Sequence, residues 1–147
     1  MRVMLKVVLV AAACATPMGA MSTEAGDVKY RKAVMKGIAG HAGAIAEIAK
    51  GNVSQDAALK GHAHALVELT KMVPAAFKNE SMAGKTTADA KVWSDWAGFE
   101  EKADDLSKAA MAIAAAAESG PGATKAKLGD LFNTCKGCHK GYRVKKK

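Results

Sequence analysis

The chain has 147 residues, a formal net charge of +8, three prolines and only 5% aromatic residues. It is rich in Ala, Lys, Glu and Leu, and this composition favours an all-α fold. Beyond the N-terminal segment no long apolar run occurs, which excludes a membrane-spanning helix there. The roughly 125 residues that follow are enough for one domain with a reasonable core.

Residues 1–22 are predicted to be a secretory signal peptide. Arg2 and Lys6 give this segment a positive start, residues 7–13 form a short apolar run, and small residues follow. The run is too short to span a bilayer. We therefore expect an exported, periplasmic protein.

Cleavage after Ala20 and cleavage after Ser22 both fit the small residues at the end of the leader. In either case we expect a mature protein of one domain, residues 23–147. Cys14 follows three alanines, which is a weak match to a lipoprotein signal, and we expect it to leave with the leader. Two cysteines then remain, both near the C-terminus.

Chain breakers divide the mature sequence into four segments, and they lie at Gly51-Asn52, at residues 74–87 and at residues 120–122. Within the segments, apolar positions recur at alternating steps of three and four, which is the pattern of closely packed helices. The second segment is the weakest, because His62 fills one of its steps. Short connections between most segments predict an antiparallel four-helix bundle.

Each segment therefore has a seam of positions expected to face the core. The first seam comprises Val28, Arg31, Met35, Ile38, Ala42, Ile45 and Ala49. The second comprises Leu59, His62, Leu66, Leu69 and Val73. The third comprises Val92, Trp96, Phe99, Ala103, Leu106, Ala110, Ile113 and Ala117, and the fourth Thr124, Leu128, Leu131, Cys135, Cys138 and Tyr142. We expect Ser54 and Thr87 to cap the second and third helices, and Gly120 to end the third.

The fourth segment contains Cys135-Lys136-Gly137-Cys138-His139, the C-x-x-C-H motif of haem c attachment. In this chemistry the two thiols add to the two vinyl groups of haem, and the adjacent imidazole coordinates the iron. Residues three and four apart share one face of a helix, so the three side chains can address one flat ligand. The motif predicts one covalently attached haem c, inserted between the helices because both cysteines lie on the seam.

A C-x-x-C pair has three other uses. A thioredoxin-like site would follow a strand in a βαβ unit, and no strand pattern precedes the motif. Zinc would need further ligands at short spacing; His62 and His64 are available, but two residues apart on a helix they point to different faces. A dithiol or disulfide is the next alternative after haem, and zinc is the last.

The residue that faces the iron opposite His139 decides the function, because a sulfur or nitrogen ligand favours electron transfer and an open position admits small gases. The candidates are Met35, Met72, Met82, Met111, His41, His62 and His64. We select Met35, which lies in the middle of the first seam. Arg31, one turn earlier, needs a partner on that apolar face, and a haem propionate would provide one. Core packing is the alternative role for Met35.

The remaining side chains of interest have structural explanations. His41 lies off the first seam and is expected to be exposed, and His62 is expected to be a hydrogen-bonded packing residue. Trp93, Trp96 and Phe99 are expected to form pocket wall and core.

Basic residues crowd the C-terminal end of the chain: Lys136, Lys140, Arg143, Lys145, Lys146 and Lys147. Such a surface would attract an acidic redox partner, or it is simply a solvated charge run. Nucleic acid is not expected as a partner, because the protein is expected in the periplasm.

Taken together, these residues resemble the cytochrome c′ family, the class II c-type cytochromes, which includes low-spin relatives with a methionine ligand. The points of similarity are Lys29-Tyr30-Arg31, Val92-Trp93-Ser94-Asp95 with Phe99 following, and the haem motif leading into Tyr142-Arg143. The position of the motif near the C-terminus also matches the family. The resemblance covers nearly the whole mature chain.

The resemblance implies that Cys135 and Cys138 hold the haem, that His139 is the proximal ligand, and that Arg31 lies near a propionate. Met35 falls at the distal position. Some members of the family are five-coordinate and bind nitric oxide or carbon monoxide, and close relatives are six-coordinate through a methionine in the first helix. A methionine also occurs there without ligating. Many members are homodimers through their first two helices.

Our main hypothesis is a periplasmic electron-transfer carrier whose haem iron is ligated by His139 and Met35. The alternative is a five-coordinate, high-spin protein that binds or buffers nitric oxide or carbon monoxide. A non-haem dithiol protein is the remote alternative. The sequence offers no nucleophile–base pair and no Gly-rich phosphate loop, so we do not predict an enzyme.

Overall fold

The computed structural model describes residues 22–144, so nearly all of the predicted signal peptide and the last three lysines lie outside the described residues. The described part forms six helices and no strand. They are α1 Glu24–Ala49, α2 Asp56–Lys71, α3 Val73–Phe77, α4 Lys91–Ser94, α5 Trp96–Glu118 and α6 Pro121–Tyr142. No helix among residues 22–144 has the combined length and apolar character that a bilayer crossing requires.

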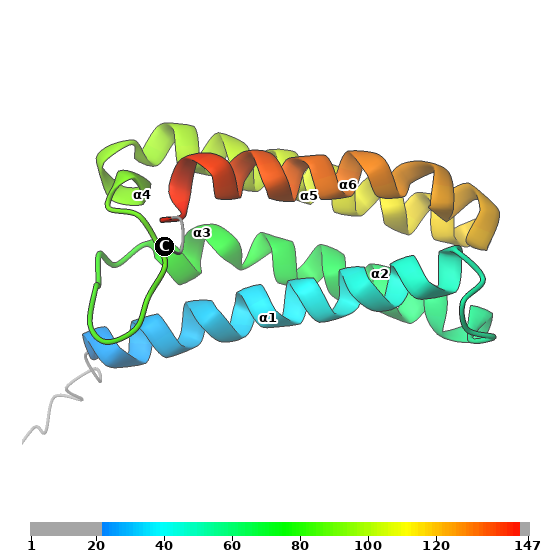
Figure 1. Cartoon of the computed structure of the whole chain (residues 1–147), viewed down its shortest axis with the longest axis horizontal. Coiled ribbons are helices and arrows are strands. Elements are labelled where there is room, and N and C mark those ends of the chain that lie inside the picture. The colour runs from blue at the N-terminus through cyan, green and yellow to red at the C-terminus, as the bar shows by residue number, and fades with distance from the viewer. Residues whose placement is uncertain (1–21, 145–147) are drawn as a thin grey trace, which may run out of the picture.

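The four long helices form an antiparallel bundle, which confirms the predicted fold (Figure 1). Around the bundle, α1 packs against α2, α2 against α5, α5 against α6 and α6 against α1. The short helices α3 and α4 lie at the end where α1 begins and α6 ends (Figure 1). The C-terminal end of α6 therefore meets elements that are far from it in sequence.

Burial follows the predicted seams. In α1, every seam residue is buried except Met35, which is half-buried. In α5, the seam residues from Phe99 to Ala117 are all buried. The α6 seam changes along its length, because Thr124, Leu128 and Leu131 are buried but the seam positions after them are only half-buried. The seams meet in one core cluster that draws on all six helices.

Two helix boundaries follow local chemistry. The hydroxyl of Thr23 accepts a hydrogen bond from the Gly26 amide at 3.1 Å, which caps the start of α1. Gly120 has a φ of +97°, a conformation that favours glycine, and it separates α5 from α6 as predicted. Pro121 follows in the first turn of α6, where its missing amide hydrogen is not needed.

The predicted caps at Ser54 and Thr87 were wrong. The N-cap of α2 is Gln55, with no side-chain cap. Thr87 lies in a loop that pairs with the end of the chain: its carbonyl accepts from the Val144 amide at 3.0 Å, and its hydroxyl accepts from Arg143 Nε at 3.1 Å. A tertiary contact therefore uses the group that was expected to cap a helix.

The third predicted helix is interrupted at Asp95, whose φ of −130° and ψ of 53° separate α4 from α5. The Asp95 carboxylate accepts a hydrogen bond from Tyr142, so this break also serves a long-range contact. The predicted breaker at Pro74 does not end helical structure, because Pro74 lies in the first turn of the short helix α3.

Candidate haem-binding site

The last turns of α6 carry Cys135 and Cys138, two free cysteines that are half-buried and packed against the core cluster. Burial raises the pKa of both thiols. The neighbouring Cys135 raises the pKa of Cys138 further, and the positive charge of Lys102 opposes this. Both side chains are thus apolar in character, reach the bundle interior and remain partly accessible.

His139 follows directly on the exposed side of α6. Partial desolvation lowers the pKa of its imidazole, and the positive charge of Arg143 lowers it further. A lowered pKa favours the neutral ring, which is the form that coordinates a metal. Residues 22–144 contain no group of three or more His, Cys, Asp and Glu side chains that could hold a metal ion, whereas a closed zinc site needs four ligands.

Arg31 of α1 is the most unusual buried residue, with 2% of its surface exposed. Its guanidinium donates a hydrogen bond to the Ser81 carbonyl and lies 5.5 Å from the ring centroid of Phe77 and 5.2 Å from that of Trp93. Desolvation lowers the pKa of Arg31, and Asp27 partly opposes this. The aromatic rings stabilise the charge, but they offer it no hydrogen-bond acceptor.

Two guanidinium atoms of Arg31, Nε and Nη1, find no hydrogen-bond partner among residues 22–144, and neither does the buried hydroxyl of Ser81. Buried polar groups without partners are costly and rare in native proteins. All three atoms can donate a hydrogen bond, and a carboxylate is the complementary acceptor. The residues present therefore fit a group that brings an anionic oxygen to this end of the bundle, as a haem propionate does.

Met35 lies one turn after Arg31, is half-buried and packs against the core cluster. The other three candidate methionines are exposed: Met72 at 42%, Met82 at 47% and Met111 at 50%. Of the candidate histidines, His64 is exposed. Met35 is thus the one candidate thioether in the described part of the chain that lies against the core.

The prediction that His41 is exposed was wrong. His41 is half-buried, and its Nδ1 lies 3.0 Å from Nδ1 of His62. The hydrogen-bonded packing role predicted for His62 is confirmed, because this ring is half-buried and bonded to its neighbour on α1.

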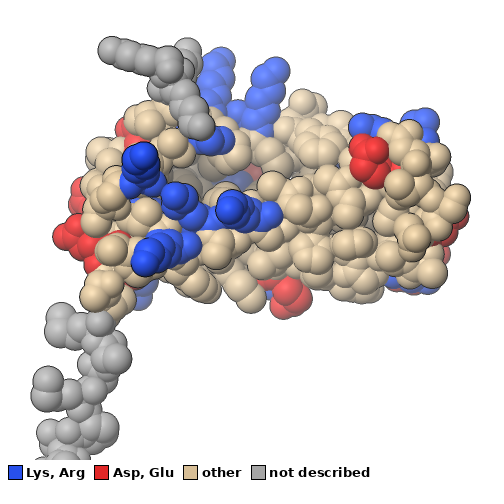
Figure 2. All heavy atoms as spheres, turned by 60° about the horizontal axis from the view of Figure 1, so that its bottom comes forward, with Lys and Arg blue, Asp and Glu red and all other residues tan. Residues whose placement is uncertain are grey.

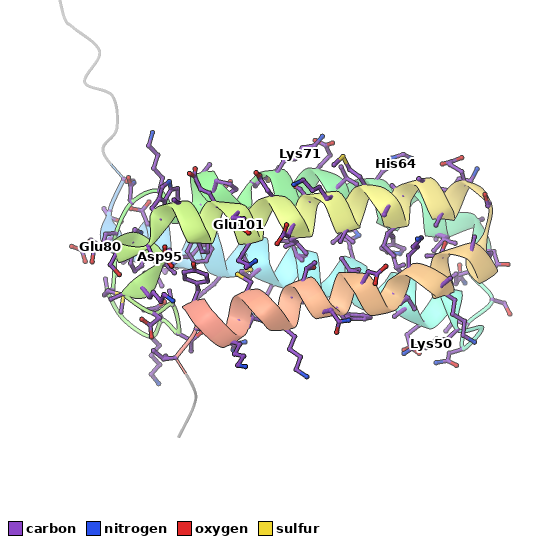
Figure 3. The ribbon with its side chains drawn as sticks, turned by 90° about the horizontal axis from the view of Figure 1, so that it is seen from above. Lys50, His64, Lys71, Glu80, Asp95 and Glu101 are labelled. Atoms are coloured by element: carbon purple, nitrogen blue, oxygen red, sulfur yellow. The ribbon has the colours of Figure 1, made fainter. Side chains whose placement is uncertain are left out.

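Sequence reasoning missed the residues that hold the C-terminal end of α6 in place. Tyr142 donates a hydrogen bond to Asp95 at 2.8 Å, and its ring packs edge-on against Phe99 with centroids 5.5 Å apart. Burial, and then the Asp95 carboxylate, raise the pKa of Tyr142 to about 12. Figure 3 shows Asp95 beside the end of α6. The sequence signals were that Tyr142 continues the fourth seam and that Asp95, Phe99 and Tyr142 belong to the family resemblance, but neither signal predicted that they contact one another.

Gly98 makes this contact possible. A Cβ at this position would lie 2.6 Å from the Tyr142 hydroxyl and 2.8 Å from Asp95 Oδ1, closer than such atoms approach in proteins. The tyrosine hydroxyl therefore occupies space that a side chain on α5 would take.

The comparison with known proteins agrees with this geometry. Residues 27–143 match the family model described as cytochrome c′. This protein belongs to the cytochrome c′ family. Its sequence is 40% identical over 119 residues to the cytochrome c′ of Pararhodospirillum photometricum, covering 79% of this chain and 94% of the relative. It is 34% identical over 147 residues to the cytochrome c′ of Rhodospirillum rubrum, covering 98% and 99%.

A solved structure is also similar: ferrous cytochrome c′ from Alcaligenes xylosoxidans, in a variant form with bound NO. The TM-score is 0.77 at 29% identity, and the match covers 86% of this chain and all of that one. Members of the family carry covalently attached haem c, and so does this protein. The haem c prediction is confirmed, and the dithiol and zinc alternatives are set aside.

The predicted basic end of this cytochrome is exposed. Lys136, Lys140 and Arg143 lie on the surface at the last turns of α6 and just beyond them, and residues 145–147 lie outside the described part. Figure 2 shows Lys and Arg side chains gathered toward one end of the molecule, while most of the remaining face is uncharged. On this face the positive charge is thus concentrated toward the end that carries the haem motif.

Proposed function

We propose that Cys135 and Cys138 hold the haem through thioether bonds, that His139 coordinates the iron, and that Arg31 pairs with a propionate. The position of both thiols on the inner side of α6 supports the first assignment. The lowered pKa of the His139 imidazole, which favours the neutral ring, supports the second. The unpartnered guanidinium and Ser81 hydroxyl support the third, because they lack an acceptor within the described chain.

Haem c supplies an iron that can take a small ligand or exchange an electron. We propose that this protein binds nitric oxide or carbon monoxide, with Met35 covering the distal side of the haem pocket without bonding to the iron. This proposal rests on solved structures of a similar cytochrome c′ with bound NO. The present chain aligns with the whole length of those structures at TM-scores of 0.75 and 0.77. The half-buried thioether would exclude water and large ligands while admitting diatomic gases.

Optical spectra of the haem-loaded protein test this function. We expect a high-spin ferric spectrum at neutral pH and rapid carbon monoxide binding by the ferrous protein, and Met35→Ala should retain both. Met111→Ala, which removes an exposed methionine on α5, is the matched control. A low-spin ferric spectrum that becomes high-spin only in Met35→Ala would refute the gas-binding proposal.

Electron transfer with His139–Met35 ligation is the second candidate. One observation favours it: Met35 is the one candidate methionine in the described chain that packs against the core, close in sequence to Arg31. The exposed basic end would then dock an acidic redox partner. The low-spin result described above is the outcome that this candidate predicts.

We further propose that residues 1–22 are removed on export to the periplasm and that residues 23–147 form one domain with a binding role and no catalytic one. The mass of the mature protein from a periplasmic extract will distinguish cleavage after Ala20 from cleavage after Ser22. By analogy with the family, we propose a homodimer, which sedimentation equilibrium will test.

A further inference from the structure

Two imidazoles face each other across the α1–α2 interface. His41 on α1 and His62 on α2 are 21 positions apart in sequence, and their Nδ1 atoms are 3.0 Å apart. The ring centroids are 5.1 Å apart and the ring planes are inclined by 58°. Both side chains are half-buried, so the pair is held by two packed helices but is still reachable from solvent. His41 lies about 9 Å along α1 from Met35, given the rise per residue of a helix.

The hydrogen bond between these atoms fixes how their protons are arranged. One Nδ1 must carry a hydrogen and donate it, and the other must present its lone pair, because a neutral imidazole has one donor and one acceptor nitrogen. If the donor ring moves its hydrogen to Nε2, both Nδ1 atoms present a lone pair to the gap between the rings. The pair then offers two neutral ligands, and no net proton is gained or lost.

The spacing of the two nitrogens selects a type of metal. A metal–imidazole bond is about 2.1 Å long, and two nitrogens 3.0 Å apart at that distance subtend an angle of about 90° at the metal. This is the angle between neighbouring ligands in a square-planar or tetragonal complex, the geometry that Cu²⁺ prefers, and it is narrower than the tetrahedral angle of zinc. Copper is also the divalent first-row metal that binds most tightly to a given nitrogen site.

We propose that His41 and His62 form a second, haem-independent metal site that binds one Cu²⁺ per chain through their Nδ1 atoms. No third His, Cys, Asp or Glu joins the pair in residues 22–144, so water completes the coordination. Both imidazoles are only half-buried in the chain, so water can reach the metal. The metal bridges α1 and α2 and stabilises their packing.

Calorimetric titration of the oxidised, haem-loaded mature protein with Cu²⁺, in glycine buffer to suppress weak sites, tests the proposal. We expect one strong site per chain, a copper EPR spectrum split by two nitrogens, and a higher thermal midpoint with copper. His41→Ala and His62→Ala should each weaken binding by at least about tenfold, since losing even an outer partner of a metal ligand costs that much. Each variant should also lose one nitrogen from the spectrum.

His64→Ala is the matched control. His64 lies on α2, as His62 does, but 68% of its side chain is exposed and it contacts Glu118. Figure 3 shows His64 on the outer side of the bundle. We expect copper binding in this variant to be unchanged. The proposal would be overturned if His41→Ala and His62→Ala bound copper as tightly as the wild type does. A wild-type EPR spectrum without nitrogen splitting would also overturn it. The wild-type spectrum decides by itself if a variant fails to fold.

Discussion

The two ends of the bundle use the same helical spacing for different purposes. At one end, which we call the aliphatic end, Ile45, Leu59, Ile113 and Leu128 converge, and each is at most 6% exposed. At the other, which we call the cysteine end, the seams continue through Arg31, Cys135, Cys138 and Tyr142, and all but the arginine are half-buried. Figure 1 shows both ends built from the same four long helices.

The two ends differ in whether the described chain supplies partners for their buried side chains. At the aliphatic end, apolar side chains pack against one another in the core cluster. The cysteine end carries a buried guanidinium with two unpartnered nitrogens and a buried hydroxyl in the same condition. Periodicity thus explains the fold at both ends, but residue type distinguishes the end proposed to hold the haem from the aliphatic end.

Removing both thiols should have the largest effect at the cysteine end. In Cys135→Ser/Cys138→Ser no thioether can form, so we expect complete loss of covalently attached haem, measured by haem staining after denaturing electrophoresis and by intact mass. The single variants serve as controls, because each retains one bond and should retain stain. Haem that remains attached to the double variant would contradict the assignment.

Replacing Arg31 by Leu tests whether its charge is paired with the haem. We expect a loss of about 3–5 kcal/mol in the unfolding free energy of the haem protein, because the propionate would be left buried without its partner. We also expect the reduction potential to fall by roughly tens of millivolts, since a positive charge near the iron favours the reduced form.

Arg31→Lys is the control, because it keeps the charge but loses the planar donor geometry. It should keep most of the potential while losing part of the stability. If Arg31→Leu destabilised the protein and left the potential unchanged, the residue would be a packing element alone.

At the aliphatic end, Ile113→Ala should affect stability and leave the haem untouched. Ile113 is fully buried, and removal of such a side chain costs about 2–5 kcal/mol. Urea unfolding will measure this loss, and the visible spectrum of the folded variant should match that of the wild type. A shifted spectrum would show that the two ends are coupled, and it would weaken the distinction drawn above.

The sequence predicted the burial of Ile45, Leu59, Ile113 and Leu128 at the aliphatic end, because such side chains have one favourable environment. The spacing of Cys135, Cys138 and His139 is chemically specific, and it predicted haem c, which the family match confirms. The sequence did not predict that Asp95 would interrupt a helix, or that Thr87 would bond to Arg143 and Val144. These features depend on contacts between residues tens of positions apart, and neither local propensity nor periodicity carries that information.

The same limit explains the histidines. His41 lies off the first seam, so a pattern of steps along one helix placed it in solvent. Its half-burial results from a ring on another helix, His62. Only the lateral arrangement of α1 and α2 brings the two together.

Tyr142→Phe tests the anchor at the end of α6. At neutral pH we expect a loss of about 1 kcal/mol in unfolding free energy, because one hydrogen bond to Asp95 disappears. The folded protein raises the pKa of Tyr142 to about 12, so above about pH 10 the unfolded chain loses this proton first and the wild type loses stability as pH rises. Urea unfolding at about pH 9 and about pH 11.5 should show the advantage of the wild type shrinking; a constant difference would contradict the raised pKa.

Gly98→Ala should have the smallest effect, because two opposed terms nearly cancel. Alanine in a helix is favoured over glycine by about 0.5–1 kcal/mol, but its Cβ would displace the Tyr142 hydroxyl, 2.6 Å away, and break the bond to Asp95. In the Tyr142→Phe background that bond is already absent. The Asp95 carboxylate, which would lie 2.8 Å from the new Cβ, is then free to turn away, so the same substitution should become stabilising by about 0.5 kcal/mol. A double-mutant cycle measures this change of sign. If the two substitutions were additive, Gly98 and Tyr142 would act independently, and the close approach of α5 to the end of α6 would not be what holds the haem motif in place.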